Sequence, residues 1–184
     1  MAAEEVDECC FVLRQGFVSN LWTVAAPAPS YDLWWQAQSE AACYRHLDKV
    51  LRLIGHKEAD RRWLLKNPGH VDQLDEVFAV FPKAKVIVTH RDPAKAVPSL
   101  VSLMIRNYPS IVEGPVELHA KLMGLRETEK WARAANRAAK VSAERPGQVL
   151  DVLTGIATGA AAKGLEKVTE RPTGKYTSIC PSQP

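Results

Sequence analysis

Hydrophobic positions recur along the chain with two periods, and these periods predict alternating helices and strands. Intervals of three and four residues predict amphipathic helices, whereas short β-branched runs predict buried strands. The predicted strands are Trp63–Leu65, Lys85–Thr89 and Val149–Leu153. The apolar stripe of one predicted helix, Glu40–Ile54, contains Ala42, Leu47, Val50, Leu51 and Ile54, and Gly55 ends this helix. The other predicted helices are Ala2–Leu13, Tyr31–Gln38, Lys95–Arg106, Val116–Ala143, Ala157–Val168 and a helix that contains Val71, Leu74, Phe78 and Phe81.

The segments Asn20–Ser30 and the tail from Thr169 are predicted to be irregular. Helices that alternate with strands favour an α/β layered fold with a mostly parallel sheet. With 184 residues, no internal repeat and no clear linker, the chain is predicted to form a single domain over residues 1–184.

Charge and cysteine usage exclude several classes of protein. The net charge of +3 is too small to indicate a nucleic-acid-binding protein. The four cysteines form no cluster with zinc spacing, so we expect no metal, and they favour a reduced, cytoplasmic protein. The apolar stretch Val149–Ala162 contains Asp151 and is too short for a membrane span.

Positive side chains follow the first two predicted strands. Lys66 follows Trp63–Leu65, and His90 and Arg91 follow Lys85–Thr89. Ligands of parallel sheets bind beyond the carboxyl ends of the strands, which makes an anion site plausible there.

Ser99 extends this anion site. If the next helix begins near Lys95, Pro98 falls in its first turn, and Ser99 lies near free N–H groups that favour anions. An arginine fork and a serine hydroxyl suit a phosphate. The alternative is an ion-paired strand-end arginine beside a serine that is merely exposed.

A second candidate constellation lies within Trp63–Phe78. Asn67 can cap a helix that has Pro68 at its first position, which places His70 in the first turn near Lys66. A histidine can accept a proton from a hydroxyl near neutral pH, and a lysine can balance the charge of a transferring group. The alternative is a capping histidine beside a surface lysine.

These two segments together resemble the sulfotransferase family. "LLKNPGH" followed by "FPKAKVIVTHRDPAKAVPSLVSLM" is similar to its bacterial branch, and weaker similarity extends over about residues 3–152. The resemblance implies a P-loop-like α/β fold and the co-substrate 3′-phosphoadenosine 5′-phosphosulfate. It also implies that Arg91 and Ser99 bind the 3′-phosphate, with His70 as the catalytic base and Lys66 stabilising the sulfuryl group. The acceptor would be a small molecule, lipid or carbohydrate.

The resemblance fails at both ends of the chain. Nothing here matches the family's first strand and its 5′-phosphosulfate-binding loop, and the residues after Val152 diverge. We therefore expect an N-terminally truncated form, whose unpaired strand edges would favour self-association. The alternative is a non-catalytic remnant that binds nucleotide or a partner.

The stretch His90-Arg91-Asp92 is also found in protein-kinase catalytic loops. The asparagine, the Asp-Phe-Gly segment and the glycine-rich loop that accompany it in kinases are missing from this sequence, so a kinase is excluded.

Overall fold

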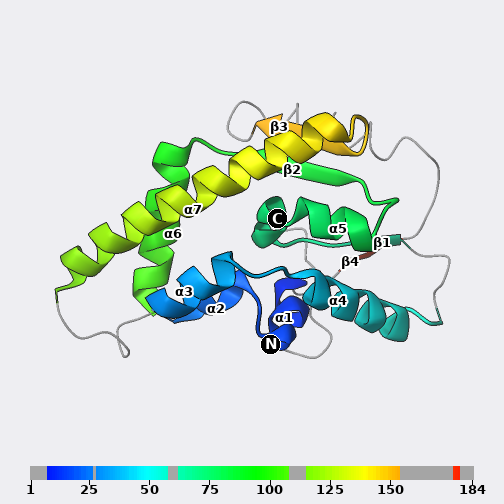
Figure 1. Ribbon diagram of the computed structural model, residues 1–184, viewed down its shortest axis with the longest axis horizontal. Coiled ribbons are helices and arrows are strands. Elements are labelled where there is room, and N and C mark those ends of the chain that lie inside the picture. Colours follow the sequence, from blue (N-terminus) through cyan, green and yellow to red (C-terminus); the bar gives the residue numbers. More distant parts are fainter. Residues whose placement is uncertain (1–7, 27, 58–61, 108–114, 154–175, 179–184) are drawn as a thin grey trace. The chain divides into compact units, whose positions relative to one another are not determined.

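The computed structural model describes residues 8–26, 28–57, 62–107, 115–153 and 176–178 (Figure 1). They belong to two compact units. The first unit contains residues 1–23, 28–70 and 172–184, and the second contains residues 24–27 and 71–171. The single domain expected over residues 1–184 stays a prediction.

The first unit is mainly helical. Its elements are α1 (Cys10–Leu13), the 3-10 turn η1 (Arg14–Gly16), the first part of α2 (Asn20–Ala25), α3 (Pro29–Gln36), α4 (Ala41–Ile54), β1 (Arg62–Leu64), the first part of the 3-10 helix η2 (Pro68–Asp72) and β4 (Tyr176–Ser178). The loop expected over Asn20–Ser30 is wrong, because α2 and the start of α3 occupy it. Pro29 is the first residue of α3, a position at which a proline costs no helical hydrogen bond.

Helix α4 was predicted almost to the residue, but its buried side differs from the expected one. Tyr44, Leu47 and Leu51 are buried, whereas Ala42 and Ile54 are exposed. Gly55 ends the helix without a left-handed backbone. A Cβ on Gly55 would lie 2.8 Å from the Trp63 ring, so close packing, rather than a turn, requires the glycine.

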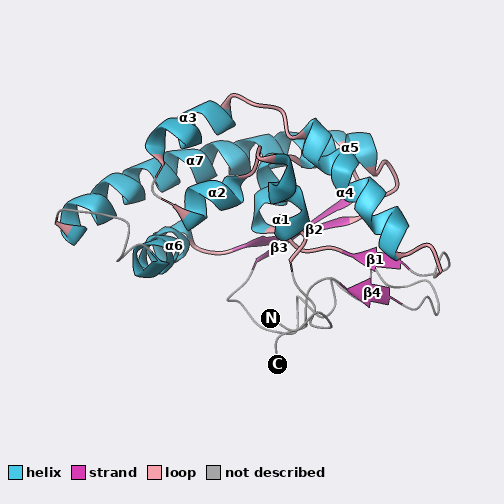
Figure 2. Cartoon of the chain, turned by 90° about the horizontal axis from the view of Figure 1, so that it is seen from below, coloured by secondary structure: helices cyan, strands magenta, loops and turns pink. Residues whose placement is uncertain are grey.

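The strands of the first unit pair in parallel, β1 with β4, as Figure 2 shows. The irregular tail expected from Thr169 is therefore wrong at Tyr176–Ser178. Of the helix predicted over Ala2–Leu13, Cys10–Leu13 is helical and residues 2–7 lie outside the described residues. The helix predicted over Ala157–Val168 also lies outside them.

The second unit combines helices with a parallel strand pair. It contains α5 (Leu74–Val80), β2 (Val86–His90), α6 (Pro93–Asn107), α7 (Val116–Glu144) and β3 (Val149–Leu153). Strands β2 and β3 pair from Val86 opposite Val149 to His90 opposite Leu153. Within the described part of the chain, β2 has β3 as its one neighbour. The mixed α/β structure with parallel strands confirms the predicted fold class.

Two clusters form the core of the second unit. The first joins α5, β2 and α7 through Leu74, Phe78, Val88, Ala138 and Val141. The second joins α6 to α7 through Val101, Met104 and Met123. The predicted spacing of Val71, Leu74 and Phe78 thus identifies a genuine core face, although α5 itself begins only at Leu74.

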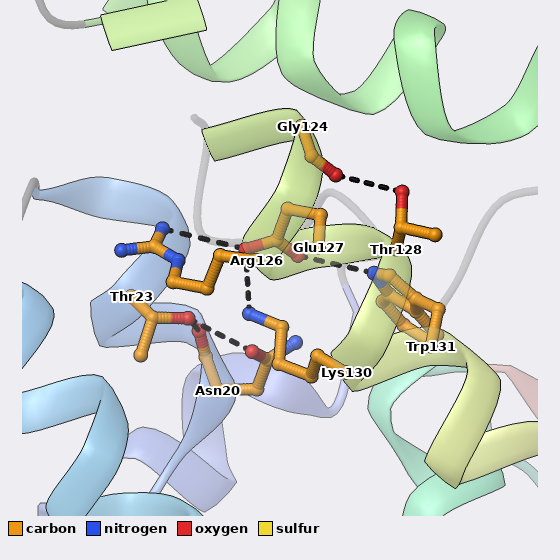
Figure 3. Close-up of polar contacts among 8 residues, drawn as sticks. All are labelled: Asn20, Thr23, Gly124, Arg126, Glu127, Thr128, Lys130 and Trp131. Carbon is orange, nitrogen blue, oxygen red and sulfur yellow. Dashed lines mark hydrogen bonds and ion pairs between the residues drawn. The ribbon is translucent and has the colours of Figure 1, made fainter. Parts of the chain in front are cut away.

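Helix α7 carries a buried acid among basic residues (Figure 3). The Glu127 carboxylate accepts hydrogen bonds from Lys130 Nζ at 2.8 Å and from Trp131 Nε1 at 3.2 Å. Glu127 and Lys130 are both almost fully buried. Lys130 is therefore held inside the fold by its ion pair with Glu127. None of the helices described is long and apolar enough to cross a membrane.

Candidate functional site

Lys66 and His70 follow β1 in the first unit, as predicted. The Asn67 Oδ1 atom accepts a hydrogen bond from the Gly69 N–H at 3.0 Å, and Pro68 is the first residue of η2. This confirms the predicted cap, although the helix that it begins is a 3-10 helix. Cys9 connects the two candidate residues, because its Sγ lies 3.1 Å from the Lys66 carbonyl oxygen and 3.2 Å from His70 Nε2.

Both ring nitrogens of His70 have partners within the first unit. Nδ1 lies 2.7 Å from the Tyr44 hydroxyl, and Nε2 contacts Cys9 Sγ. Tyr44 and Cys9 are fully buried. Burial of the imidazole lowers the pKa of His70 to about 4, so the ring is neutral at physiological pH.

The Lys66 ammonium forms an ion pair with the Glu8 carboxylate. The Lys66 side chain is 52% exposed and the Glu8 side chain 28% exposed, so the pair is accessible to water. Ion pairs at this level of exposure contribute only about 0–1 kcal/mol, and a competing anion can replace Glu8 at little cost.

Arg91 lies in the second unit, directly after β2, and is exposed. Among the residues that the structure describes, no hydrogen bond or ion pair engages its guanidinium group. The preceding His90 is different, because its Nε2 lies 2.7 Å from Asp151 Oδ1 on β3. Of these two side chains, Arg91 is thus the one that is open to a phosphate.

Ser99 is exposed on α6, but it lies farther from the start of the helix than expected. The helix begins at Pro93, which makes Ser99 its seventh residue and places Pro98 beyond the first turn. The expectation that Pro98 lies in the first turn is therefore wrong. On a helix, Lys95 and Ser99 share a face because they are four residues apart.

The start of α6 also lacks the free N–H groups that were expected there. Asp92 Oδ1 accepts from the Ala94 N–H at 2.9 Å, and the Asp92 carbonyl oxygen accepts from the N–H groups of Lys95 and Ala96. Pro93 has no N–H to offer. A phosphate at this place would consequently depend on side chains, above all on Arg91.

The structure thus brings Lys66 and His70 together through Cys9 in the first unit, and it places Arg91 and Ser99 on the β2–α6 segment of the second unit. That the two pairs form one site stays a prediction.

Two comparisons with known proteins find relatives of this chain. The family model described as the sulfotransferase family matches residues 1–153. The chain belongs to the sulfotransferase family. It is also similar to the crystal structure of sulfotransferase STF1 from Mycobacterium tuberculosis H37Rv, with 30% sequence identity and a TM-score of 0.73. That match covers 92% of this chain and 45% of the mycobacterial chain, so this chain spans less than half of its relative's length. No curated protein matches the chain significantly.

A further feature of this sulfotransferase-family chain is a groove between α6 and α7. It has a volume of about 720 Å³ and is lined mostly by apolar side chains, among them Val97, Val101 and Ile105. Ser102, Arg106 and Thr128 are the polar residues at its wall. No group of three or more potential metal ligands occurs within the described ranges.

Four residues near the candidate site were missed by the sequence analysis, namely Glu8, Cys9, Tyr44 and Asp92. Two of them had a detectable signal. Asp92 directly precedes Pro93, which is the pattern of a capped helix with proline at its first position. The spacing of Tyr44 with Leu47 and Leu51 identifies the buried stripe of α4. Glu8 and Cys9 had no such signal, because their partners are far away in the sequence.

Proposed function

We propose that this chain serves the transfer of a sulfuryl group from 3′-phosphoadenosine 5′-phosphosulfate to a hydroxyl or amine. The acceptor is a small molecule, a lipid or a carbohydrate. Arg91 and Ser99 bind the 3′-phosphate, His70 acts as the base, and Lys66 stabilises the transferring group.

The observation that carries this proposal is the open guanidinium group of Arg91 at the carboxyl end of a parallel strand. Arg91 is exposed, and its charge is not neutralised by any residue that the structure describes. A guanidinium group binds phosphate through two parallel hydrogen bonds. Lys95 adds a second positive charge on the helix face that carries Ser99.

In this proposal His70 and Lys66 each have a role in the transfer step. The acceptor oxygen attacks the sulfur and gives its proton to the neutral His70, while the bond from sulfur to the phosphate oxygen breaks and that oxygen keeps the electron pair. The positive charge of Lys66 opposes the negative charge of the transferring group. A nearby sulfuryl group would also raise the pKa of His70, because a negative charge favours the imidazolium.

The test is a calorimetric titration of the chain with adenosine 3′,5′-bisphosphate. We expect binding by the unchanged chain and at least a tenfold loss in the Arg91→Ala variant, since one tenfold step corresponds to about 1.4 kcal/mol of lost charged hydrogen bonding. Arg133→Ala is the matched control, because Arg133 is an exposed arginine of the same unit. Equal losses in both variants, or no binding by the folded unchanged chain, would refute the proposed phosphate site.

A specific observation supports nucleotide binding without transfer as a second candidate function. The groups assigned to the chemistry are engaged within the protein, with Lys66 paired to Glu8 and His70 bonded to Tyr44 and Cys9. Arg91, by contrast, is open. A transfer assay with a mixture of hydroxyl and amine acceptors separates the two functions. Bisphosphate binding together with product supports the enzyme, whereas binding without product supports the nucleotide-binding protein.

A further inference from the structure

The groove between α6 and α7 is lined by rows of residues that lie four positions apart along each helix. Two neighbouring rows of α6 begin at Pro93 and Ala94 and end at Ile105 and Arg106, and one row of α7 passes through Gly124. Because a helix rises by 1.5 Å per residue, the groove follows α6 for about 20 Å. All of its lining residues belong to the second unit, so the groove lies within one unit.

Two residues that weaken helices line this groove, Pro98 in α6 and Gly124 in α7. A proline inside a helix cannot donate to the carbonyl four residues before it, and a glycine there is less favourable than an alanine. A Cβ on Gly124 would have no neighbouring atom within 4 Å, so crowding does not require the glycine. Its effect is to leave the floor of the groove open. Residues that oppose their local structure in this way are expected mainly at functional sites.

The wall of the groove is apolar along most of its length and carries a positive charge at one end. The Thr128 hydroxyl donates to the Gly124 carbonyl at 2.7 Å, so it is used within α7 (Figure 3). Among the described lining residues, Arg106 is the one with a charge. It is exposed, and its Nε donates to the Ser102 carbonyl of its own helix. Within the part of the chain that the structure describes, no acid forms an ion pair with Arg106.

We propose that this groove binds a single-chain amphiphile with an anionic head group, of the fatty-acid class. The alkyl chain lies along the apolar rows of α6, and the carboxylate contacts the terminal N–H groups of Arg106. An extended alkyl chain with carbon–carbon bonds of about 1.5 Å would need roughly 16 carbons to follow the groove from Arg106 to Pro93. A charged hydrogen bond to the guanidinium group fixes the orientation of the chain.

This inference goes beyond the proposed function. It involves neither the phosphate site at Arg91 and Ser99 nor the transfer step at His70 and Lys66. Its tests therefore measure binding alone, and their results do not depend on whether the chain transfers a sulfuryl group.

The first test is calorimetry of the full chain with dodecanoate below its micelle-forming concentration. Complete burial of one methylene strengthens binding about fourfold, and in an open groove we expect about twofold. Dodecanoate should therefore bind at least tenfold more tightly than octanoate, which is four methylenes shorter. Dodecyltrimethylammonium has the same chain with a positive head group, and it should bind at least fivefold more weakly than dodecanoate. Equal affinities for the two head groups, or no binding of dodecanoate by the folded chain, would overturn the proposal.

The Gly124→Leu variant fills the floor of the groove. Because the added Cβ has no close neighbour and leucine favours a helix, we expect urea unfolding to show no loss of stability. The affinity for dodecanoate should fall at least tenfold. Ala135→Leu is the matched control, since it adds the same side chain at an exposed position of α7 outside the groove. Equal effects of the two variants on dodecanoate binding would show that the groove is not the binding place.

The Arg106→Gln variant tests the charged end. We expect the affinity for dodecanoate to fall about fivefold and the preference over dodecyltrimethylammonium to disappear. Lys121→Gln is the matched control, because it removes an exposed cation of α7 that does not line the groove. A preference for the anion that survives in Arg106→Gln would overturn the role of Arg106.

Analytical ultracentrifugation tests a different occupant of the groove, a second copy of the chain. We expect Gly124→Leu to leave the sedimentation of the chain unchanged. A dimer that this variant converts to a monomer would show that protein fills the groove, and it would overturn the proposal.

Discussion

Lys66 Nζ and the Glu8 carboxylate form an ion pair at the end of β1. The cation assigned to the sulfuryl group is therefore already neutralised by a residue of the same unit. Since the pair is accessible to water, its partners can separate when a stronger anion arrives. Glu8 thus sets how much of the Lys66 charge is available to a ligand.

The Glu8→Gln variant should make Lys66 more available to anions. We expect the affinity for the 5′-phosphosulfate analogue adenosine 5′-phosphosulfate to rise about threefold, which is less than 1 kcal/mol and within the range for an exposed ion pair. Asp48→Asn is the matched control, because it removes the acid of another water-exposed ion pair of the first unit, with Arg52. Calorimetry measures both affinities, and equal effects of the two variants would contradict the prediction.

His70 should make the stability of the fold depend on pH. Its pKa is about 4 in the folded chain and near 6.5 when unfolded, so the unfolded chain binds more protons between these values. The stability associated with neutral His70 is complete above pH 6.5 and is lost as the pH falls to 4. Because His70 as a whole is only half-buried, we expect the free energy of unfolding to fall by about 2 kcal/mol.

Urea unfolding at pH 7, 5.5 and 4 measures this loss, with His70→Gln as the comparison. Glutamine does not titrate, and the difference between the two chains therefore isolates the contribution of His70. Parallel stability curves would show that the pKa of His70 is not lowered by burial.

The affinity for the bisphosphate should depend on the shape of the Arg91 guanidinium group as well as on its charge. Arg91→Lys keeps the charge but loses the paired hydrogen bonds, and we expect it to weaken bisphosphate binding about tenfold. Ser99→Ala removes one neutral donor, for which we expect about a threefold loss. Calorimetry with adenosine 3′,5′-bisphosphate and with adenosine 5′-monophosphate measures these losses. Losses of the same size for both nucleotides would exclude a contact with the 3′-phosphate.

Asp92 should act in opposite directions on stability and on binding. Asp92→Ala removes the acceptor of the Ala94 N–H, so we expect a loss of about 1 kcal/mol in the free energy of unfolding. It also removes a negative charge next to Arg91, so bisphosphate affinity should rise about twofold. Asp92→Asn keeps the cap without the charge, and it should raise the affinity while leaving stability nearly unchanged. An affinity loss in both variants would mean that Asp92 contacts the ligand itself.

The elements that were predicted well are those whose residues carry a strong local pattern. β3 was predicted to the residue, and α4 and α7 to within one residue, because periodic burial or a β-branched run determines them locally. The start of α6 was placed two residues late, since Lys95 was preferred to the Asp92-Pro93 cap. The strand Tyr176–Ser178 was missed, because it exists only through pairing with β1.

The candidate site was likewise predicted only where its signals are local in the sequence. From the sequence alone came the family resemblance, the parallel α/β fold class and the four side chains Lys66, His70, Arg91 and Ser99, because a short chain segment contains each of these signals. Only the tertiary structure revealed that Glu8 neutralises Lys66 and that Cys9 and Tyr44 hold both nitrogens of His70. These contacts join residues from distant segments. Their distances depend on how α4, β1 and η2 pack within the first unit, and no local pattern encodes that packing.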